Sequence, residues 1–129
     1  MAEEPRESSL QVRFVSLLWG VLFLGSGLFK MLALAPQEEL FRRFGLPAWV
    51  MVAVGLGEIA LGGLVLSPRW RPWAALAMAV EMIVAGVAHL VSGVAPNMVA
   101  ANAALFVGAV WLLITERSLL LPPRTPHAT

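Results

Sequence analysis

The fold class is decided by residues 47–66, which read PAWVMVAVGLGEIALGGLVL. Their number is close to the roughly 20 residues that an α-helix needs to cross the hydrocarbon core of a bilayer, and Glu58 is their one charged residue. A soluble core helix would alternate polar and apolar faces, which this stretch does not do. Similar apolar stretches cover residues 14–35, 73–92 and 97–115. Because backbone groups in lipid must be hydrogen-bonded internally, we expect four membrane-spanning α-helices.

Composition excludes several classes of protein. Of the 129 residues, 59% are hydrophobic and 13% are charged, whereas an ordinary soluble domain is about 45–50% apolar and about 25% charged. A soluble globule and a disordered chain are both excluded by these values. A net charge of +1 gives no sign of nucleic-acid binding. The absence of cysteine from the sequence excludes disulfides, thiolate metal sites, a cysteine nucleophile and a dithiol redox relay.

The sequence predicts an all-α integral membrane four-helix bundle with antiparallel, up-down-up-down topology. We expect a transmembrane domain over residues 14–115, between a polar tail at residues 1–13 and a second tail at residues 116–129. No proline lies inside a span, and the short connections after the second and third spans allow antiparallel neighbours only. The first span is expected to stay in the protein rather than be cleaved as a signal peptide, because its apolar run is long and Lys30 interrupts its end.

Basic residues predict the orientation of the bundle. Four spans place both termini on one side of the membrane, together with six arginines: Arg6, Arg13, Arg69, Arg71, Arg117 and Arg124. The opposite side holds Arg42 and Arg43, with Lys30 near the membrane edge. Because cytoplasmic loops carry the excess of Lys and Arg, we expect both termini in the cytoplasm.

The loop over residues 37–46 has the pattern of a short amphipathic helix. Glu38 and Arg42, and likewise Glu39 and Arg43, lie four residues apart, so they can form ion pairs on one helix face. Such a helix would lie on the membrane surface. Two interpretations stay open: a connector that floats on the headgroups, and a lid over a site for a lipophilic ligand.

Polar residues within apolar spans are functional hypotheses by default. From the helical rise of about 1.5 Å per residue, Glu58 and Glu81 both lie about 12 Å from the inner boundary. Lys30 and His89 lie about 24 Å from it, and Asn102 about 20 Å. The sequence thus predicts one layer with Lys30, His89 and Asn102 and a second layer, below it, with the two carboxyl groups.

These five residues are our candidates for ligand binding or for a proton relay. They could bind the polar head of a molecule whose tail lies in lipid. A structural role is the alternative: Lys30 and His89 could extend to the headgroups, and Glu58 and Glu81 could form interhelical hydrogen bonds. We expect no metal site, because Glu81 and His89 are separated by about 12 Å along the helix.

Small residues mark helix-packing faces. Ala100, Ala104 and Gly108 recur every four residues in the fourth span, a spacing that lets helices approach closely. This row could pack within the bundle or form a homodimer interface.

Several motifs together resemble the DoxX family of small four-helix bacterial and archaeal membrane proteins. They are Gly25-Ser-Gly27-Leu-Phe-Lys30, Phe44-Gly45-Leu-Pro47, Gly55-Leu-Gly57-Glu58-Ile-Ala-Leu-Gly62-Gly63 and Ala88-His89-Leu90. The resemblance covers roughly residues 14–115. It implies a prokaryotic cell-membrane protein, and Lys30, Glu58 and His89 match the family's polar positions. Glu81 departs from that pattern. The member that gives the family its name resembles a subunit of a thiosulfate:quinone oxidoreductase.

Two functional hypotheses follow. The first is a quinone-linked membrane subunit of an oxidoreductase, in which Lys30, His89 or Asn102 bonds a quinone carbonyl and Glu58 or Glu81 exchanges protons. Without a built-in redox cofactor, it would take electrons from a partner protein and would not be catalytic alone. The second is a non-enzymatic binder of a lipid or small lipophile, or a scaffold of a membrane complex.

Overall fold

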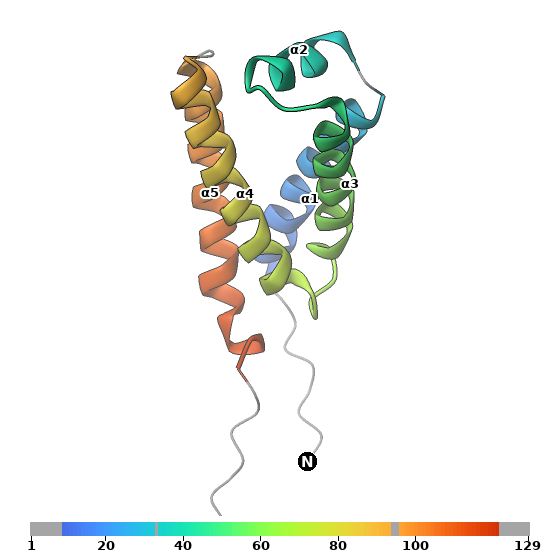
Figure 1. Ribbon diagram of the computed structural model, residues 1–129. Helices are drawn as coiled ribbons and strands as arrows, with labels where there is room; N and C mark the ends of the chain where they lie inside the picture. Colours follow the sequence, from blue (N-terminus) through green and yellow to red (C-terminus); the bar gives the residue numbers. More distant parts are fainter. Residues whose placement is uncertain (1–8, 33, 94–95, 122–129) are drawn as a thin grey trace, which may run out of the picture.

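The computed structural model describes residues 9–32, 34–93 and 96–121. Over this part of the chain the secondary structure is helical, without strands (Figure 1). The elements in order are α1 (Leu10–Met31), α2 (Ala35–Arg43), α3 (Ala48–Leu64), α4 (Arg71–Ser92), α5 (Pro96–Glu116) and the 3₁₀ helix η1 (Arg117–Leu119). The expected all-α fold class is confirmed.

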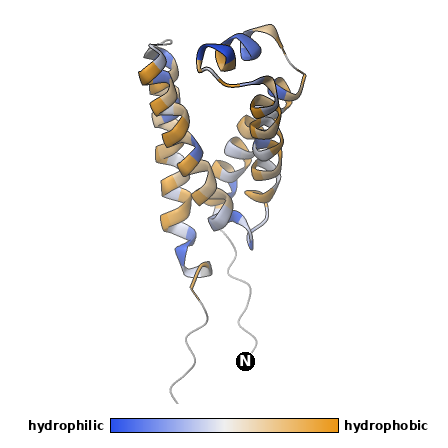
Figure 2. Ribbon diagram, in the orientation of Figure 1, coloured by the Kyte–Doolittle hydropathy of each residue, from blue (hydrophilic) through white to orange (hydrophobic). Residues whose placement is uncertain are grey.

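Three of the described helices are long and apolar enough to cross a membrane: Leu10–Met31, Arg71–Ser92 and Asn97–Glu116. Helix α3 has 17 residues and meets the same test only together with α2, from which it is bent by 114°. Large apolar side chains cover the outside of these helices, including Phe14 at 65% and Val91 at 84% exposure. Figure 2 shows the long helices as mostly apolar and α2 as mostly polar. A bilayer is the environment that such a surface requires.

Helix ends differ from the predicted spans for local reasons. Helix α1 begins at Leu10 rather than at residue 14, because the Ser9 side chain accepts a hydrogen bond from the Val12 N–H at 3.3 Å and caps the helix. Residues 10–13 therefore belong to α1 and not to the predicted polar tail, whose residues 1–8 lie outside the described part. The predicted span 14–35 is divided, since α1 ends at Met31 and Ala35 opens α2.

The long helices form two antiparallel pairs that meet at one end of the molecule. Helix α1 packs along α3, and α4 packs along α5. A shared core, which includes Val12, Phe23, Val65, Met78 and Leu112, joins the pairs at the end where α1 starts. Toward the opposite end the pairs diverge, and α2 lies there across the α1–α3 pair (Figure 1). We call these the core end and the cavity end.

Glycines bring α1 and α3 into backbone contact. A Cβ atom added at Gly27 would lie 2.5 Å from the Gly55 carbonyl oxygen and 2.9 Å from the Ile59 nitrogen. A Cβ at Gly62 would lie 2.9 Å from the Gly20 carbonyl oxygen. No side chain fits at these positions without a shift of the neighbouring backbone, so the glycines allow α1 and α3 to approach closely.

Arg71 joins three helix ends at the core end. Its side chain is buried, and its Nε donates a hydrogen bond at 3.0 Å to the carbonyl oxygen of Val65, directly after α3. Its Nη1 lies 3.8 Å from Glu116 at the end of α5. Because the last carbonyls of a helix have no partner within the helix, this guanidinium caps α3 and also fixes the start of α4.

The small-residue row of α5 packs within the bundle at Gly108. A side chain there would overlap the ring of Trp19, whose Nε1 donates a hydrogen bond to the Leu105 carbonyl oxygen at 3.0 Å. The intramolecular interpretation is thus confirmed at this position. Ala100 and Ala104 of the same row are exposed.

Helix α2 confirms the amphipathic helix expected over residues 37–46. Arg43 pairs with Glu39 at 2.9 Å, as predicted. The predicted pair of Glu38 with Arg42 is wrong, because Arg42 instead bonds Glu39, one helical turn away. Hydrogen bonds from Arg42 and Arg43 lower the pKa of Glu39.

The glycine contacts predict which substitutions the fold tolerates. We expect Gly27→Ala to lower the free energy of unfolding by about 1–3 kcal/mol, because α1 and α3 must separate to admit the methyl group. Gly25→Ala is the matched control, since a Cβ there meets nothing within 4 Å, and it should be neutral or stabilising. Unfolding by sodium dodecyl sulfate in mixed micelles measures both. Equal stability of the two variants would contradict the close approach.

Candidate functional site

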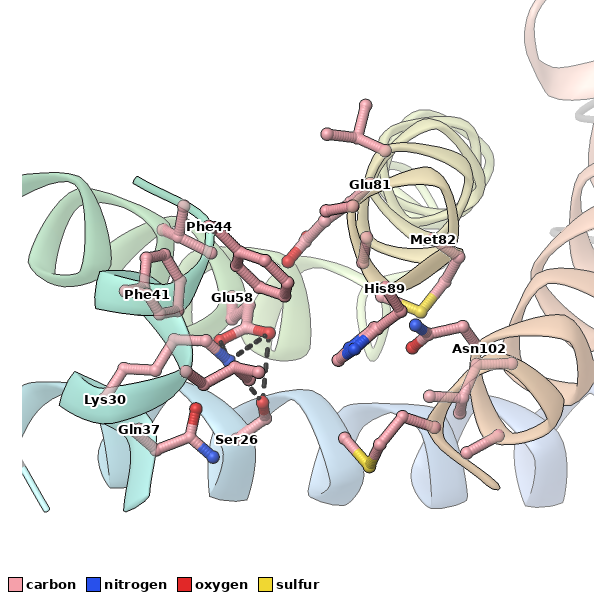
Figure 3. Close-up of a pocket in the computed structure, with 18 of the residues that line it drawn as sticks. Ser26, Lys30, Gln37, Phe41, Phe44, Glu58, Glu81, Met82, His89 and Asn102 are labelled. Atoms are coloured by element: carbon pink, nitrogen blue, oxygen red, sulfur yellow. Dashed lines mark hydrogen bonds and ion pairs between the residues drawn. The ribbon is translucent and has the colours of Figure 1, made fainter. Parts of the chain in front are cut away.

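A cavity of about 360 Å³ lies between the two helix pairs toward the cavity end. All five α-helices contribute to its wall. Most of the lining is apolar, and Ser26, Lys30, Gln37, Glu58, Glu81, His89 and Asn102 add polar groups. Figure 3 shows their side chains on both sides of the cavity. The five residues singled out from the sequence thus line one cavity.

Lys30 and Glu58 form a buried ion pair on one wall. Lys30 Nζ lies 2.8 Å from Glu58 Oε2 and 3.0 Å from Oε1. Ser26 completes the group, since its hydroxyl donates to Glu58 Oε1 at 3.0 Å and accepts from Lys30 Nζ at 2.8 Å. The two charged residues are 8% and 4% exposed. A charge this far from water needs such a partner.

Helix geometry explains how Lys30 reaches Glu58. Helical side chains lean toward the N-terminus of their own helix. On antiparallel helices, Lys30 of α1 and Glu58 of α3 therefore lean toward each other. Ser26 lies four residues before Lys30, on the same helix face. Gly55 provides the space, since a Cβ on it would lie 2.9 Å from the Lys30 Cβ.

The predicted separation of Lys30 from the carboxyl layer is therefore wrong. Depths counted along the helix locate Cα atoms, whereas two long side chains that lean toward each other close the gap between turns. Lys30 also does not extend toward the headgroups, because an ammonium group has three N–H donors and the bonds to Ser26 and to both Glu58 oxygens use all three.

Glu81 lies across the cavity from this ion pair. It is half-buried on α4, and its carboxyl group points toward Glu58 (Figure 3). The structure thus brings the two acids to one cavity, as their equal predicted depth suggested. Unlike Glu58, Glu81 has no basic residue within ion-pair distance in the described part of the chain.

His89 and Asn102 form the opposite wall with unsatisfied polar atoms. Both side chains are buried, and His89 Nδ1 and Asn102 Nδ2 have no hydrogen-bond partner among the described residues. Buried polar groups in native proteins are nearly always bonded, so these two atoms call for a water molecule or a ligand as partner. The Phe44 ring stands edge-on to the His89 ring, with centroids 5.3 Å apart.

Sequence reasoning missed Ser26 and did not identify which residues of the α2 region line the site. Ser26 could have been found from its spacing of four residues to Lys30. From the α2 region, Gln37, Leu40, Phe41 and Phe44 line the cavity, which favours the lid interpretation. Phe41 and Phe44 contact each other edge-to-face with centroids 6.2 Å apart. Their alternation with charged residues was the signal.

The described residues contain no group of three or more His, Cys, Asp or Glu side chains placed to hold a metal ion. Glu58, Glu81 and His89 line the same cavity, and their arrangement does not meet that condition. The polar groups of the cavity can bind a ligand by hydrogen bonds and electrostatics.

Fold and site define an integral membrane helical protein with a polar group inside an apolar cavity. The chain belongs to the DoxX-like family, whose sequence profile matches residues 14–112. No match was found among curated proteins or among solved structures.

The ion pair predicts a double-mutant signature. Lys30→Met leaves Glu58 buried without its partner and should cost about 3–5 kcal/mol of unfolding free energy. The double variant Lys30→Met/Glu58→Leu should recover much of this loss, because no buried charge remains. Arg43→Met, at an exposed ion pair, is the control and should cost about 1 kcal/mol or less. Additive losses in the double variant would contradict the pairing. Mixed-micelle unfolding measures all three.

Proposed function

We propose that the protein is a quinone-linked membrane subunit of an oxidoreductase complex, with the quinone head in the cavity between the helix pairs. The proposal rests on one observation: polar residues with unsatisfied hydrogen-bonding atoms line a cavity whose other walls are apolar. Asn102 and His89 line a largely apolar cavity, and Asn102 Nδ2 and His89 Nδ1 have no hydrogen-bond partner among the described residues. A quinone offers two carbonyl acceptors on an apolar ring, and its tail can lie in lipid between the pairs.

Different residues of the cavity would bind the quinone and exchange its protons. The Asn102 amide would donate a hydrogen bond to one carbonyl oxygen, and His89 would bond the other. Lys30 is a weaker candidate for this contact, because its three donors are already used. Reduction of a quinone to a quinol adds two electrons and two protons. A redox partner protein would supply both electrons. Glu81 would pass one proton to each carbonyl oxygen in turn, taking up a new proton from water between the two transfers.

We further propose that α1, α3, α4 and α5 all cross the prokaryotic inner membrane and that both termini are cytoplasmic. The excess of arginine at the core end supports this orientation: Arg13, Arg69, Arg71 and Arg117 lie in its helix ends and connections, against Arg42 and Arg43 at the cavity end.

A non-enzymatic role is the second candidate: binding of a lipid or small lipophile, or support of a larger membrane complex or homo-oligomer. The observation that favours it is the ion pair of Lys30 and Glu58, whose hydrogen bonds with Ser26 are made within the protein. Polar groups that satisfy each other hold helices together and need no chemistry.

Quinone binding tests the proposed function. In lipid nanodiscs, a quinone with a short alkyl tail should bind, and Asn102→Leu should weaken the affinity about tenfold through loss of one hydrogen bond. Asn97→Leu is the matched control, because it makes the same change at an exposed position of the same helix. Calorimetric titration measures the affinities. Absence of binding, or equal weakening by both variants, would reject the quinone site.

Orientation can be tested with single cysteines, because the sequence has none. We expect Glu38→Cys to react with a membrane-impermeant maleimide in intact cells. Ser118→Cys, in η1, should react only after the membrane is permeabilised. The reverse pattern would place the termini outside.

A further inference from the structure

The cavity holds one more acidic group than basic partners. Besides Glu81, the ionisable residues that line the cavity in the described part of the chain are Lys30 from α1, Glu58 from α3 and His89 from α4. The α2 and α5 walls contribute polar groups without charge, namely Gln37 and Asn102. Lys30 and Glu58 neutralise each other at 2.8 Å. With a neutral imidazole, the wall therefore has a formal charge of −1, located on Glu81.

An uncompensated carboxylate in an apolar cavity is costly. Lys30 forms its ion pair with Glu58 and not with Glu81, and its three N–H donors are directed at Ser26 and Glu58. Either a proton or a bound monocation supplies the missing positive charge. Glu81 is half-buried and its carboxyl group points into the cavity (Figure 3), so a ligand there can reach it.

Aromatic residues line the cavity together with the acid. Phe23, Phe41 and Phe44 line the same cavity as Glu81. The faces of aromatic rings attract cations, and aromatic surroundings are typical of sites that bind substituted ammonium groups. The aliphatic remainder of the lining, which includes Val50, Val54, Val84 and Leu105, suits apolar substituents rather than a hydrated inorganic ion.

We propose that this cavity binds a lipophilic organic monocation of the substituted ammonium class, with the Glu81 carboxylate as its counter-ion. The apolar substituents would lie among the phenylalanines and valines and extend into lipid between the helix pairs. This binding is an activity beyond the quinone-linked function and does not depend on it, because it uses charge where a quinone uses carbonyl acceptors.

Two amphiphiles of similar shape and opposite charge test the proposal: benzyldimethyldodecylammonium and dodecylbenzenesulfonate. Binding is measured below their micellar concentrations with protein in nanodiscs, and empty nanodiscs give the background from lipid partitioning. We expect saturable binding of the ammonium compound and no binding of the sulfonate above background. Equal binding of the two probes, or binding of neither, would overturn the proposal.

Charge-neutral variants locate the counter-ion. Glu81→Gln keeps the shape of the side chain and should weaken binding of the ammonium probe about tenfold or more. Glu38→Gln makes the same change at an exposed acid of α2 outside this cavity and should leave the affinity unchanged. No difference between the two variants would overturn the assignment to Glu81.

A pH series on the unmodified protein gives a second measurement if Glu81→Gln does not fold. A proton competes with the cation for the Glu81 carboxylate, so the affinity should fall as the pH is lowered. Protonation of His89 acts in the same direction, and Glu81→Gln, where it folds, should keep only that smaller dependence. A pH-independent affinity of the unmodified protein would overturn the proposal. Loss of quinone binding with retained ammonium binding would reject the quinone function alone.

Discussion

The buried pair of Lys30 and Glu58 is the constraint that the packing of α1 against α3 must satisfy. In hydrocarbon an isolated charge is strongly disfavoured, so the two side chains must stay within hydrogen-bond distance. That distance requires close helices, and the contacts of Gly27 with Gly55 and of Gly20 with Gly62 provide them. Substitution of these glycines would therefore disturb the electrostatics of the site as well as the packing.

The two helix pairs differ in whether their buried polar groups are hydrogen-bonded. In the α1–α3 pair, Ser26, Lys30 and Glu58 bond one another. The α4–α5 pair instead leaves polar atoms of His89 and Asn102 without a partner in the described chain. The core and Arg71 hold the pairs together at the core end. The two helix pairs therefore diverge toward the cavity end. The wall formed by His89 and Asn102 lines the cavity there.

Much of the fold was predictable from the sequence, because lipid imposes strong rules. Apolar stretches of sufficient length, with proline kept to their ends, indicated the helices, and the Glu39–Arg43 spacing indicated α2. For the site, the sequence predicted the main polar residues but not the contacts between them. Depth along a helix does not give its rotation or the reach of a long side chain, which is why Lys30 was placed in the wrong layer. The edge contact of Phe44 with His89 joins residues that are distant in the sequence. A local sequence pattern does not predict such a contact.

Roles within the site divide between its charged residues. Lys30 and Glu58 satisfy each other and hold α1 against α3. Glu81 lies across the cavity, and it is the acid that this pairing leaves without an ion-pair partner among the described residues. Because the pair is complete without Glu81, the packing of α1 on α3 does not depend on the charge of Glu81. The ligand preference of the cavity should therefore be sought at Glu81 rather than at the ion pair.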